Sequence, residues 1–102
     1  MLVALVALAS GLSVTVDSLS IDNRRHIASA IARVTNSGTN AFESVYVNCA
    51  FLDASGRAVQ VGGALVSNLA PGETAFGSAD VDSSLVATPI ASASCRIGMT
   101  QP

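Results

Sequence analysis

Asp53, Ser55 and Arg57 lie close together in the stretch DASGR, and their side chains are of the types that attack, transfer protons or bind ions. Their spacing fits no motif that uses such groups. A calcium loop needs acidic or amide residues at alternate positions and a closing Glu. A nucleophile elbow needs a Gly two residues before the Ser. Because apolar stretches flank DASGR, we interpret it as a turn in which Asp53 caps the backbone, Gly56 supplies a positive φ and Arg57 starts the return strand.

The single histidine, His26, limits the other chemistries. A Ser–His–Asp triad would need His26 beside a serine, and nothing in the sequence places it there. Glu73 and Asp80 fall at expected turns or strand ends, where charges are normally solvated. Cys95 and Met99 have the spacing of a blue-copper loop, but such a site also requires two histidines. We therefore predict no catalytic residue, no cofactor and no metal site.

The composition is that of one small domain with a core of small side chains. The chain has 102 residues, of which 50% are hydrophobic and only 4% aromatic, so Val, Ala, Leu and Ile must fill the interior. The net charge is −2, and the five basic residues are scattered arginines. A nucleic-acid surface needs clustered positive charge, so we predict no nucleic-acid partner.

The N-terminal stretch differs from the rest of the chain. Residues 1–16 carry no charged side chain, and an apolar run ends in Ala7-Leu8-Ala9. This pattern is typical of the end of a secretory signal with cleavage before Ser10, although the basic residues that usually precede the run are missing. The run is short for a membrane span. We predict that residues 1–9 are a truncated signal-peptide remnant, that residues 10–102 form one domain, and that the protein is periplasmic or secreted.

Apolar and polar residues alternate with a period of two over most of the remaining chain, which is the pattern of half-buried strands. Turn-forming clusters such as TNSGTN, DASG and SNLAPGE separate the alternating stretches. No stretch has the pattern of a capped amphipathic helix. About seven short strands predict an all-β fold, an immunoglobulin-like antiparallel β-sandwich. The clearest strands are expected over residues 13–19, 27–35, 44–51, 58–67, 74–81 and 90–97.

The two cysteines are in phase with the inward residues of their strands. Cys49 alternates with Val47 and Phe51, and Cys95 alternates with Ala93 and Ile97. Two inward cysteines in an exported protein predict one disulfide. Such a bond would close a long loop and stabilise the fold by roughly 4 kcal/mol. The alternative is a pair of buried free thiols that pack as small apolar groups.

Three short motifs resemble the FxLYD domain, an immunoglobulin-like module of exported prokaryotic proteins. A V-x-N motif ends one strand, the hairpin of F-x-L-Y-D-x-x-G follows, and L-x-P-G-E-T precedes a later strand. The matching residues are Val34, Thr35 and Asn36 for the first motif, Asp53 and Gly56 for the second, and Leu69, Pro71, Gly72, Glu73 and Thr74 for the third.

The F-x-L-Y-D motif, from which the family takes its name, is only partly present in this sequence. Cys49 stands where Phe is usual, Phe51 where Leu is usual and Leu52 where Tyr is usual. The resemblance covers roughly residues 14–97 and concerns turns and core positions. It implies a fold and no catalytic residue. Within this motif, the position of Cys49 agrees with a bond to Cys95 on a neighbouring strand.

We predict a non-enzymatic binding or structural module of the cell envelope whose partner is a protein or another envelope component. It would be a monomer or weak oligomer without a stable membrane span. Candidate contact regions are the end loops 36–40, 53–57 and 69–73, because sandwiches of this type bind through end loops or free edges. Tyr46 is the best single contact candidate, and its alternative role is packing against a neighbouring strand.

Two alternatives remain at this point. One is a periplasmic carrier of a metal or small ligand that uses Cys95, Met99 and His26. The other is a pilus-type assembly subunit that completes its fold with a strand from a partner.

Overall fold

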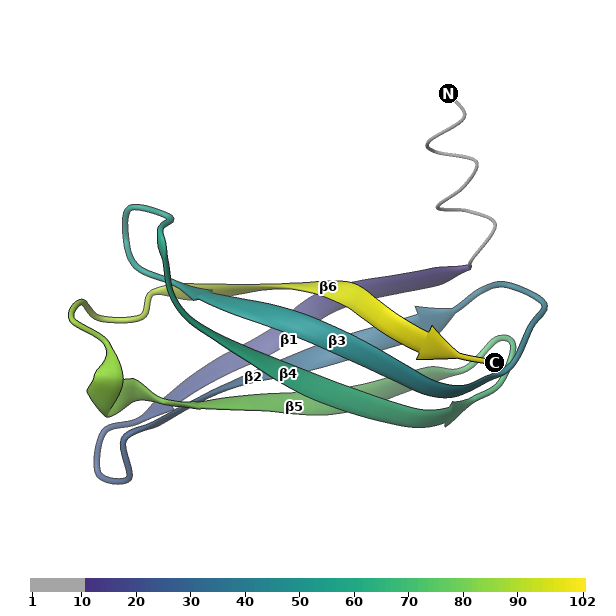
Figure 1. The fold of residues 1–102 in the computed structure, drawn as a ribbon, viewed down its shortest axis with the longest axis horizontal. Helices are drawn as coiled ribbons and strands as arrows, with labels where there is room; N and C mark the ends of the chain where they lie inside the picture. The colour runs from purple at the N-terminus through teal and green to yellow at the C-terminus, as the bar shows by residue number, and fades with distance from the viewer. Residues whose placement is uncertain (1–10) are drawn as a thin grey trace.

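The computed structural model describes residues 11–102 as a sandwich of two antiparallel three-stranded sheets (Figure 1). One sheet has the order β1-β2-β5, and the other has the order β4-β3-β6. The strands are β1 (Leu12–Asp22), β2 (Ile27–Asn36), β3 (Phe42–Leu52), β4 (Ala58–Leu69), β5 (Thr74–Asp82) and β6 (Ser92–Gln101). A short 3₁₀ turn, η1 (Ser83–Leu85), follows β5. The all-β sandwich is therefore confirmed.

Each stretch that the sequence marks as a strand contains a strand, but the last one begins at Ser92 rather than at residue 90 and continues to Gln101. The described residues contain six strands rather than about seven. No helix within residues 11–102 is long and apolar enough to cross a membrane. The predictions for residues 1–9 and for cleavage before Ser10 lie outside the described residues.

The core follows from the alternation along the two central strands. On β2, every second residue from Ala28 to Val34 is fully buried, and on β3 every second residue from Val45 to Phe51 is buried. Side chains on neighbouring positions of a strand point to opposite faces. The intervening residues therefore form the outer faces. Because β2 contributes mainly alanines, the two sheets meet through small side chains.

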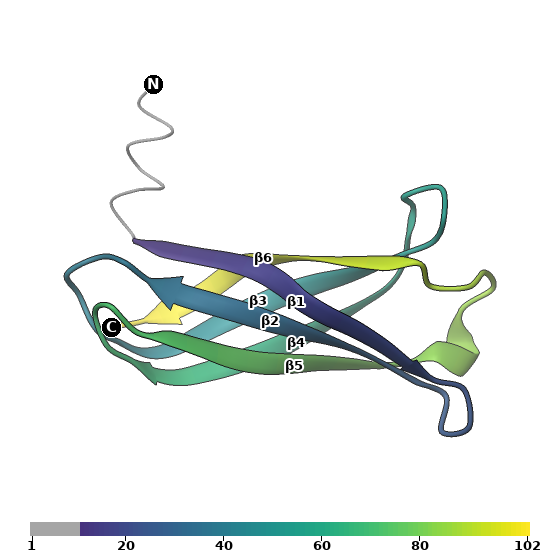
Figure 2. The same cartoon turned by 180° about the vertical axis from the view of Figure 1, so that it is seen from behind.

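The two sheets come together along both long sides of the molecule. Strand β6 lies beside β1 on one side, and β4 lies beside β5 on the other, as both views show (Figures 1 and 2). Within residues 11–102, no hydrogen-bonded ladder joins either pair. Each of the four outer strands therefore has one edge that no ladder among the described residues occupies.

Gly62 marks a close approach of the sheets on the β4–β5 side. A Cβ at this position would lie 2.9 Å from Cγ1 of Val81, so only glycine fits without movement. A glycine inside a strand typically marks either a bulge or a close approach, and Gly62 marks a close approach. The bulge lies elsewhere, where the β3–β4 register shifts between Phe51 and Leu52.

Candidate binding surface

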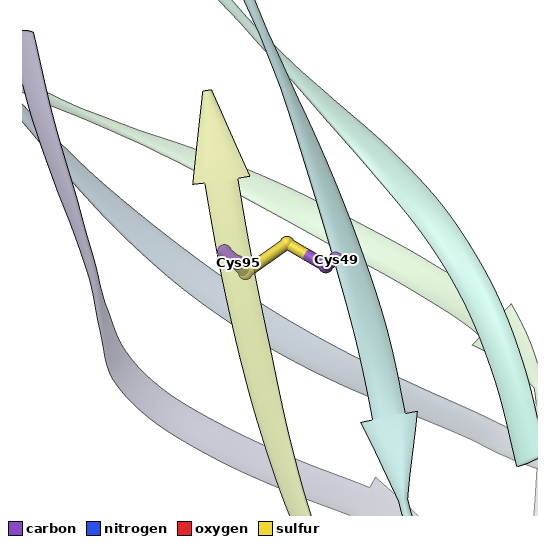
Figure 3. The surroundings of a disulfide bond; sticks show 2 residues. All are labelled: Cys49 and Cys95. Carbon is purple, nitrogen blue, oxygen red and sulfur yellow. A yellow bond between two sulfur atoms is a disulfide. The ribbon is translucent and has the colours of Figure 1, made fainter. Parts of the chain in front are cut away.

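Cys49 and Cys95 form the predicted disulfide (Figure 3). The S–S distance is 2.06 Å, and the two residues are 46 positions apart in the sequence. They are direct register partners on β3 and β6, so the bond joins neighbouring strands of one sheet. Cys49 is buried in the core, whereas Cys95 is only half-buried. Neither sulfur is a free thiol, and the bond is a structural feature of the kind that oxidising compartments permit.

The DASGR stretch is the turn between β3 and β4. The Asp53 Oδ1 accepts hydrogen bonds from the backbone N–H of Ser55 at 2.9 Å, the Ser55 hydroxyl at 2.6 Å and the N–H of Arg57 at 3.1 Å. Gly56 has a φ of +87°, as the turn requires. The Ser55 hydroxyl bond, helped by the backbone N–H groups, lowers the pKa of Asp53. This carboxylate is therefore an ionised capping group, and Ser55 is its donor rather than a nucleophile.

Two of the end loops are fastened to each other by Asn36, whose side chain is completely buried. Its Nδ2 donates to the carbonyl of Asn40 at 2.8 Å and to that of Leu69 at 3.3 Å, while its Oδ1 accepts from the N–H of Gly38. Its backbone carbonyl accepts from Gly72 N–H at 2.7 Å. The residues that carried two of the family motifs thus meet in one hydrogen-bonded cluster. Their role here is to hold the loops, which leaves fewer free polar groups for a ligand.

The outer face of the β4-β3-β6 sheet carries an exposed apolar patch. It consists of Tyr46, Val61, Leu65 and Met99, which we call the outer patch. Tyr46 and Leu65 are direct cross-strand partners, and Met99 lines the same depression of about 310 Å³. A second, larger depression of about 680 Å³ lies beside it, between Tyr46, Val61 and Arg96. The patch is therefore a continuous surface with relief into which a partner's side chains can fit.

Gly63 shapes this surface. A Cβ at position 63 would overlap the Tyr46 ring, so the ring lies over the glycine backbone of the neighbouring strand. An aromatic ring placed across a strand glycine shields the glycine's backbone. Tyr46 still leaves 42% of its surface exposed. Its cross-strand packing role and its exposure therefore coexist.

The outer face of the β1-β2-β5 sheet is polar and internally hydrogen-bonded. The Thr35 and Thr74 hydroxyls lie 3.1 Å apart, and Arg33 Nε donates to the Thr15 hydroxyl at 3.5 Å. Hydroxyl bonds from Ser29 and then Ser78 lower the pKa of Asp80 on the same face. Among the described residues, Phe76 is the one large apolar side chain exposed there. The β1-β2-β5 face is therefore suited to contact with solvent, whereas the face that carries the outer patch is suited to contact with a partner.

His26 and Met99 are not brought together. His26 precedes β2 in the turn after β1, with a φ of 57°, whereas Met99 lies near the end of β6 at the opposite end of the sandwich (Figure 1). Cys95, the third member of the carrier alternative, is engaged in the disulfide. Within residues 11–102, no group of three or more His, Cys, Asp or Glu side chains is placed to hold a metal ion. The three residues of that alternative therefore form no common site.

Of the outer-patch residues, the sequence marks Tyr46 as a contact candidate and Met99 only as a possible ligand in the carrier alternative, and Val61 and Leu65 were missed. The signal was present in β4, where residues 61–66 contain no polar side chain. Side chains along a strand alternate between its two faces, so a stretch without polar side chains must also place apolar groups on the outer face.

The architecture defines the molecule as an immunoglobulin-like antiparallel β-sandwich. No protein-family model matches the chain, and no curated protein sequence matches it. Among solved structures, IrmA from Escherichia coli is similar, with a TM-score of 0.56 over 89% of this chain and 84% of that chain. The two sequences are 12% identical, so the likeness supports the fold alone. The resemblance to the FxLYD domain stays a prediction.

Proposed function

We propose that this protein is a non-enzymatic binding module, exported to the periplasm or beyond, that contacts a protein partner through the outer patch. The observation that carries the proposal is that four of the seven exposed large apolar side chains among residues 11–102 lie together on one face of the sandwich. Tyr46, Val61, Leu65 and Met99 gather on the β4-β3-β6 sheet, while hydroxyl and carboxylate groups cover most of the other face. Grouped apolar side chains on a monomer mark interaction surfaces more often than scattered ones do.

The composition of the patch favours a protein as the partner. Tyr and Met are enriched at protein interfaces, since an aromatic ring with a polar tip and a flexible thioether both adapt to a partner surface. The two depressions on either side of the Tyr46 ring offer places for a partner's side chains. We infer that Tyr46 is the central contact and that the aliphatic residues around it exclude water.

Export is supported by the disulfide. A bond between cysteines persists where the compartment is oxidising, and small exported domains use such bonds to supplement a limited core. The intact mass of protein purified from its native host tests this part. A chain that begins at Ser10 and shows no free thiol before reduction supports export, and a full-length chain with two reactive thiols would overturn it.

Site-specific photo-crosslinking tests the binding surface. A benzoylphenylalanine replaces Leu65 in one variant and Phe76 in a second, since these side chains are 58% and 57% exposed on opposite faces. In the native host, we expect a discrete crosslinked product from position 65 and none from position 76. The product should disappear when Tyr46→Ala is added. Equal crosslinking from both positions, or a product that is indifferent to Tyr46, would refute the outer patch as the interface.

A further inference from the structure

The two long sides of the sandwich differ in how well they cover the core. On the β4–β5 side, the inward side chains of Ala64, Val66, Ala79 and Val81 are buried. On the other side, the inward side chains are only half-buried. We call this side the β1–β6 seam, and its inward residues include Val14, Val16 and Leu19 of β1 and Ala93, Cys95 and Ile97 of β6. The hydrophobic core is thus covered better along the β4–β5 side, where Val59 and Ala75 are the half-buried exceptions, than along the β1–β6 seam.

The backbone of β6 presents free hydrogen-bonding groups at this seam. The Cα atoms of Cys49 and Cys95 are 4.0 Å apart, which is the close spacing of a pair whose backbone groups do not bond to each other. The N–H and C=O of Cys95 therefore point away from β3. By the alternation of an antiparallel ladder, those of Ala93 and Ile97 point the same way. No strand within residues 11–102 pairs with that edge.

Nothing on β6 blocks an added strand. Exposed edges are usually protected by charges, prolines or bulges. The neighbouring edge strand β1 has such protection, because Asp17 lies at a bulge between Val16 and Ser18. Over Ser92–Gln101, β6 has no proline and a single charge, Arg96. Its irregularity lies beyond Ile97, so the stretch from Ala93 to Ile97 is regular.

The strand order identifies what belongs at the seam. In immunoglobulin-like sandwiches, the sheet that contains strands C and F continues with a strand G beside F. Here β3 and β6 take the places of C and F. A strand inserted beside β6 would pair with the free groups of Ala93, Cys95 and Ile97. Its alternate side chains would cover the half-buried residues of both β1 and β6.

We propose that the β1–β6 seam captures an extended segment of a partner protein, with apolar residues at alternate positions facing the core and a carboxylate beside Arg96. Arg96 lies on the outer face and has no ion-pair partner among residues 11–102, so an acidic side chain of the added strand would complement it. This interaction is strand addition to a sheet edge, in which backbone bonds supply affinity and side-chain pockets supply register. Its backbone contacts lie at the edge of β6 and not on the outer patch, although Arg96 borders both surfaces.

A second copy of this chain is a poorer occupant. A two-fold antiparallel pairing of β6 that uses all the free groups would place Cys95 opposite its counterpart. The two Arg96 side chains would then lie diagonally across the new strand pair on one face. Diagonal neighbours are roughly 7–8 Å apart, within reach of long side chains, and like charges there are unfavourable. Since β6 carries no carboxylate, nothing in the strand would offset them.

The test is an NMR titration of the purified disulfide-bonded protein. The probe is a short capped peptide that alternates valine and threonine, with glutamate in place of the central threonine. We expect saturable shifts below about 1 mM peptide, and slowed hydrogen exchange at the amides of Ala93, Cys95 and Ile97. The same peptide with N-methylated alternate amides should not bind. No shift at millimolar peptide, or shifts centred on Tyr46, would overturn the proposal.

Two variants sharpen the test. Arg96→Glu should weaken binding of the glutamate peptide by about fivefold, while the matched reversal Arg33→Glu on the other sheet leaves it unchanged. Ala93→Pro removes an N–H that faces the free edge and not the β3 ladder, so the protein should stay folded and lose binding. Equal binding by Ala93→Pro would overturn strand addition. A stable dimer that Ala93→Pro dissociates would show that the seam is a self-interface, which contradicts the proposal.

Discussion

Removal of the disulfide should cost this protein a large share of its stability. The perturbation is the double substitution Cys49→Ala and Cys95→Ala, which deletes the covalent link between β3 and β6. The two cysteines are 46 residues apart. The loss of loop-closure entropy from the unfolded chain then corresponds to about 4 kcal/mol at 25 °C. A chain of this size is typically stable by about 5–15 kcal/mol, so the variant would be marginal.

Urea unfolding followed by far-ultraviolet circular dichroism measures this effect. We expect the free energy of unfolding to fall by about 4 kcal/mol and the midpoint of thermal unfolding to fall by about 20 °C. The dependence on urea should steepen, because an unlinked unfolded chain exposes more surface. The wild-type protein under full reduction is the matched control. It keeps both sulfur atoms in place, so its difference from the double variant gives the packing contribution of the two sulfur atoms, of which Cys49 is the buried one.

A loss below about 1 kcal/mol in the reduced wild type would refute the entropy argument. It would mean that β3 and β6 remain associated in the unfolded chain, so that the bond restricts little. A large loss in the double variant alone, with a small loss on reduction, would instead assign the effect to the packing of Cys49.

Three further predictions concern local structure. Asn36→Ala should lower the free energy of unfolding by about 3 kcal/mol in urea titrations, because it leaves buried backbone groups of two loops without partners. The control Asn40→Ala, at an exposed position, should change it little. Gly62→Ala should destabilise the folded protein by about 1–3 kcal/mol in the same assay, because its Cβ would press on the buried Val81. Gly63→Ala should cost less, because its Cβ meets the movable end of the Tyr46 side chain. The folded-state pKa of Asp53 lies below its ordinary value, so the ionised carboxylate contributes to the free energy of unfolding above about pH 4. That contribution is lost as the pH falls through the folded-state pKa. Asp53→Asn should therefore make the free energy of unfolding depend less on pH in urea titrations at acidic pH.

Each of these has a contrary result. Equal effects of the two asparagine substitutions would show that the loop cluster is not held by Asn36. A larger cost at Gly63 than at Gly62 would mean that the Tyr46 ring is fixed rather than movable. An unchanged acid limb in the Asp53 variant would remove the turn carboxylate from the pH dependence.

Local chemistry made the turns and the disulfide predictable from sequence. Asp53 and Gly56 specify their turn through groups within a few residues, so no tertiary information is needed. The inward phase of Cys49 and Cys95 follows from the period-two alternation of their own strands. The register that places them directly opposite each other depends on the long-range pairing of β3 and β6, and the sequence alone does not contain it.

The outer patch and the loop cluster could not be derived in this way. Whether Leu65 faces solvent depends on which side of β4 meets the other sheet, and β4 is apolar on both sides over residues 61–66. Asn36 appeared as a turn residue, yet its side chain is buried because the segments from residues 36–40 and 69–73 converge on it. Both features arise from contacts between segments that are distant along the chain.

The disulfide and the open seam are connected through the same strand. β6 has no fully buried side chain, has one neighbour in its sheet and leaves three residues' backbone groups directed outward. Burial alone therefore holds β6 less firmly than the central strands β2 and β3. The bond to Cys49 joins β6 to β3, whose alternate side chains are buried. A strand fixed in this way can keep a free edge exposed for a partner without relying on that partner to stay in the sheet.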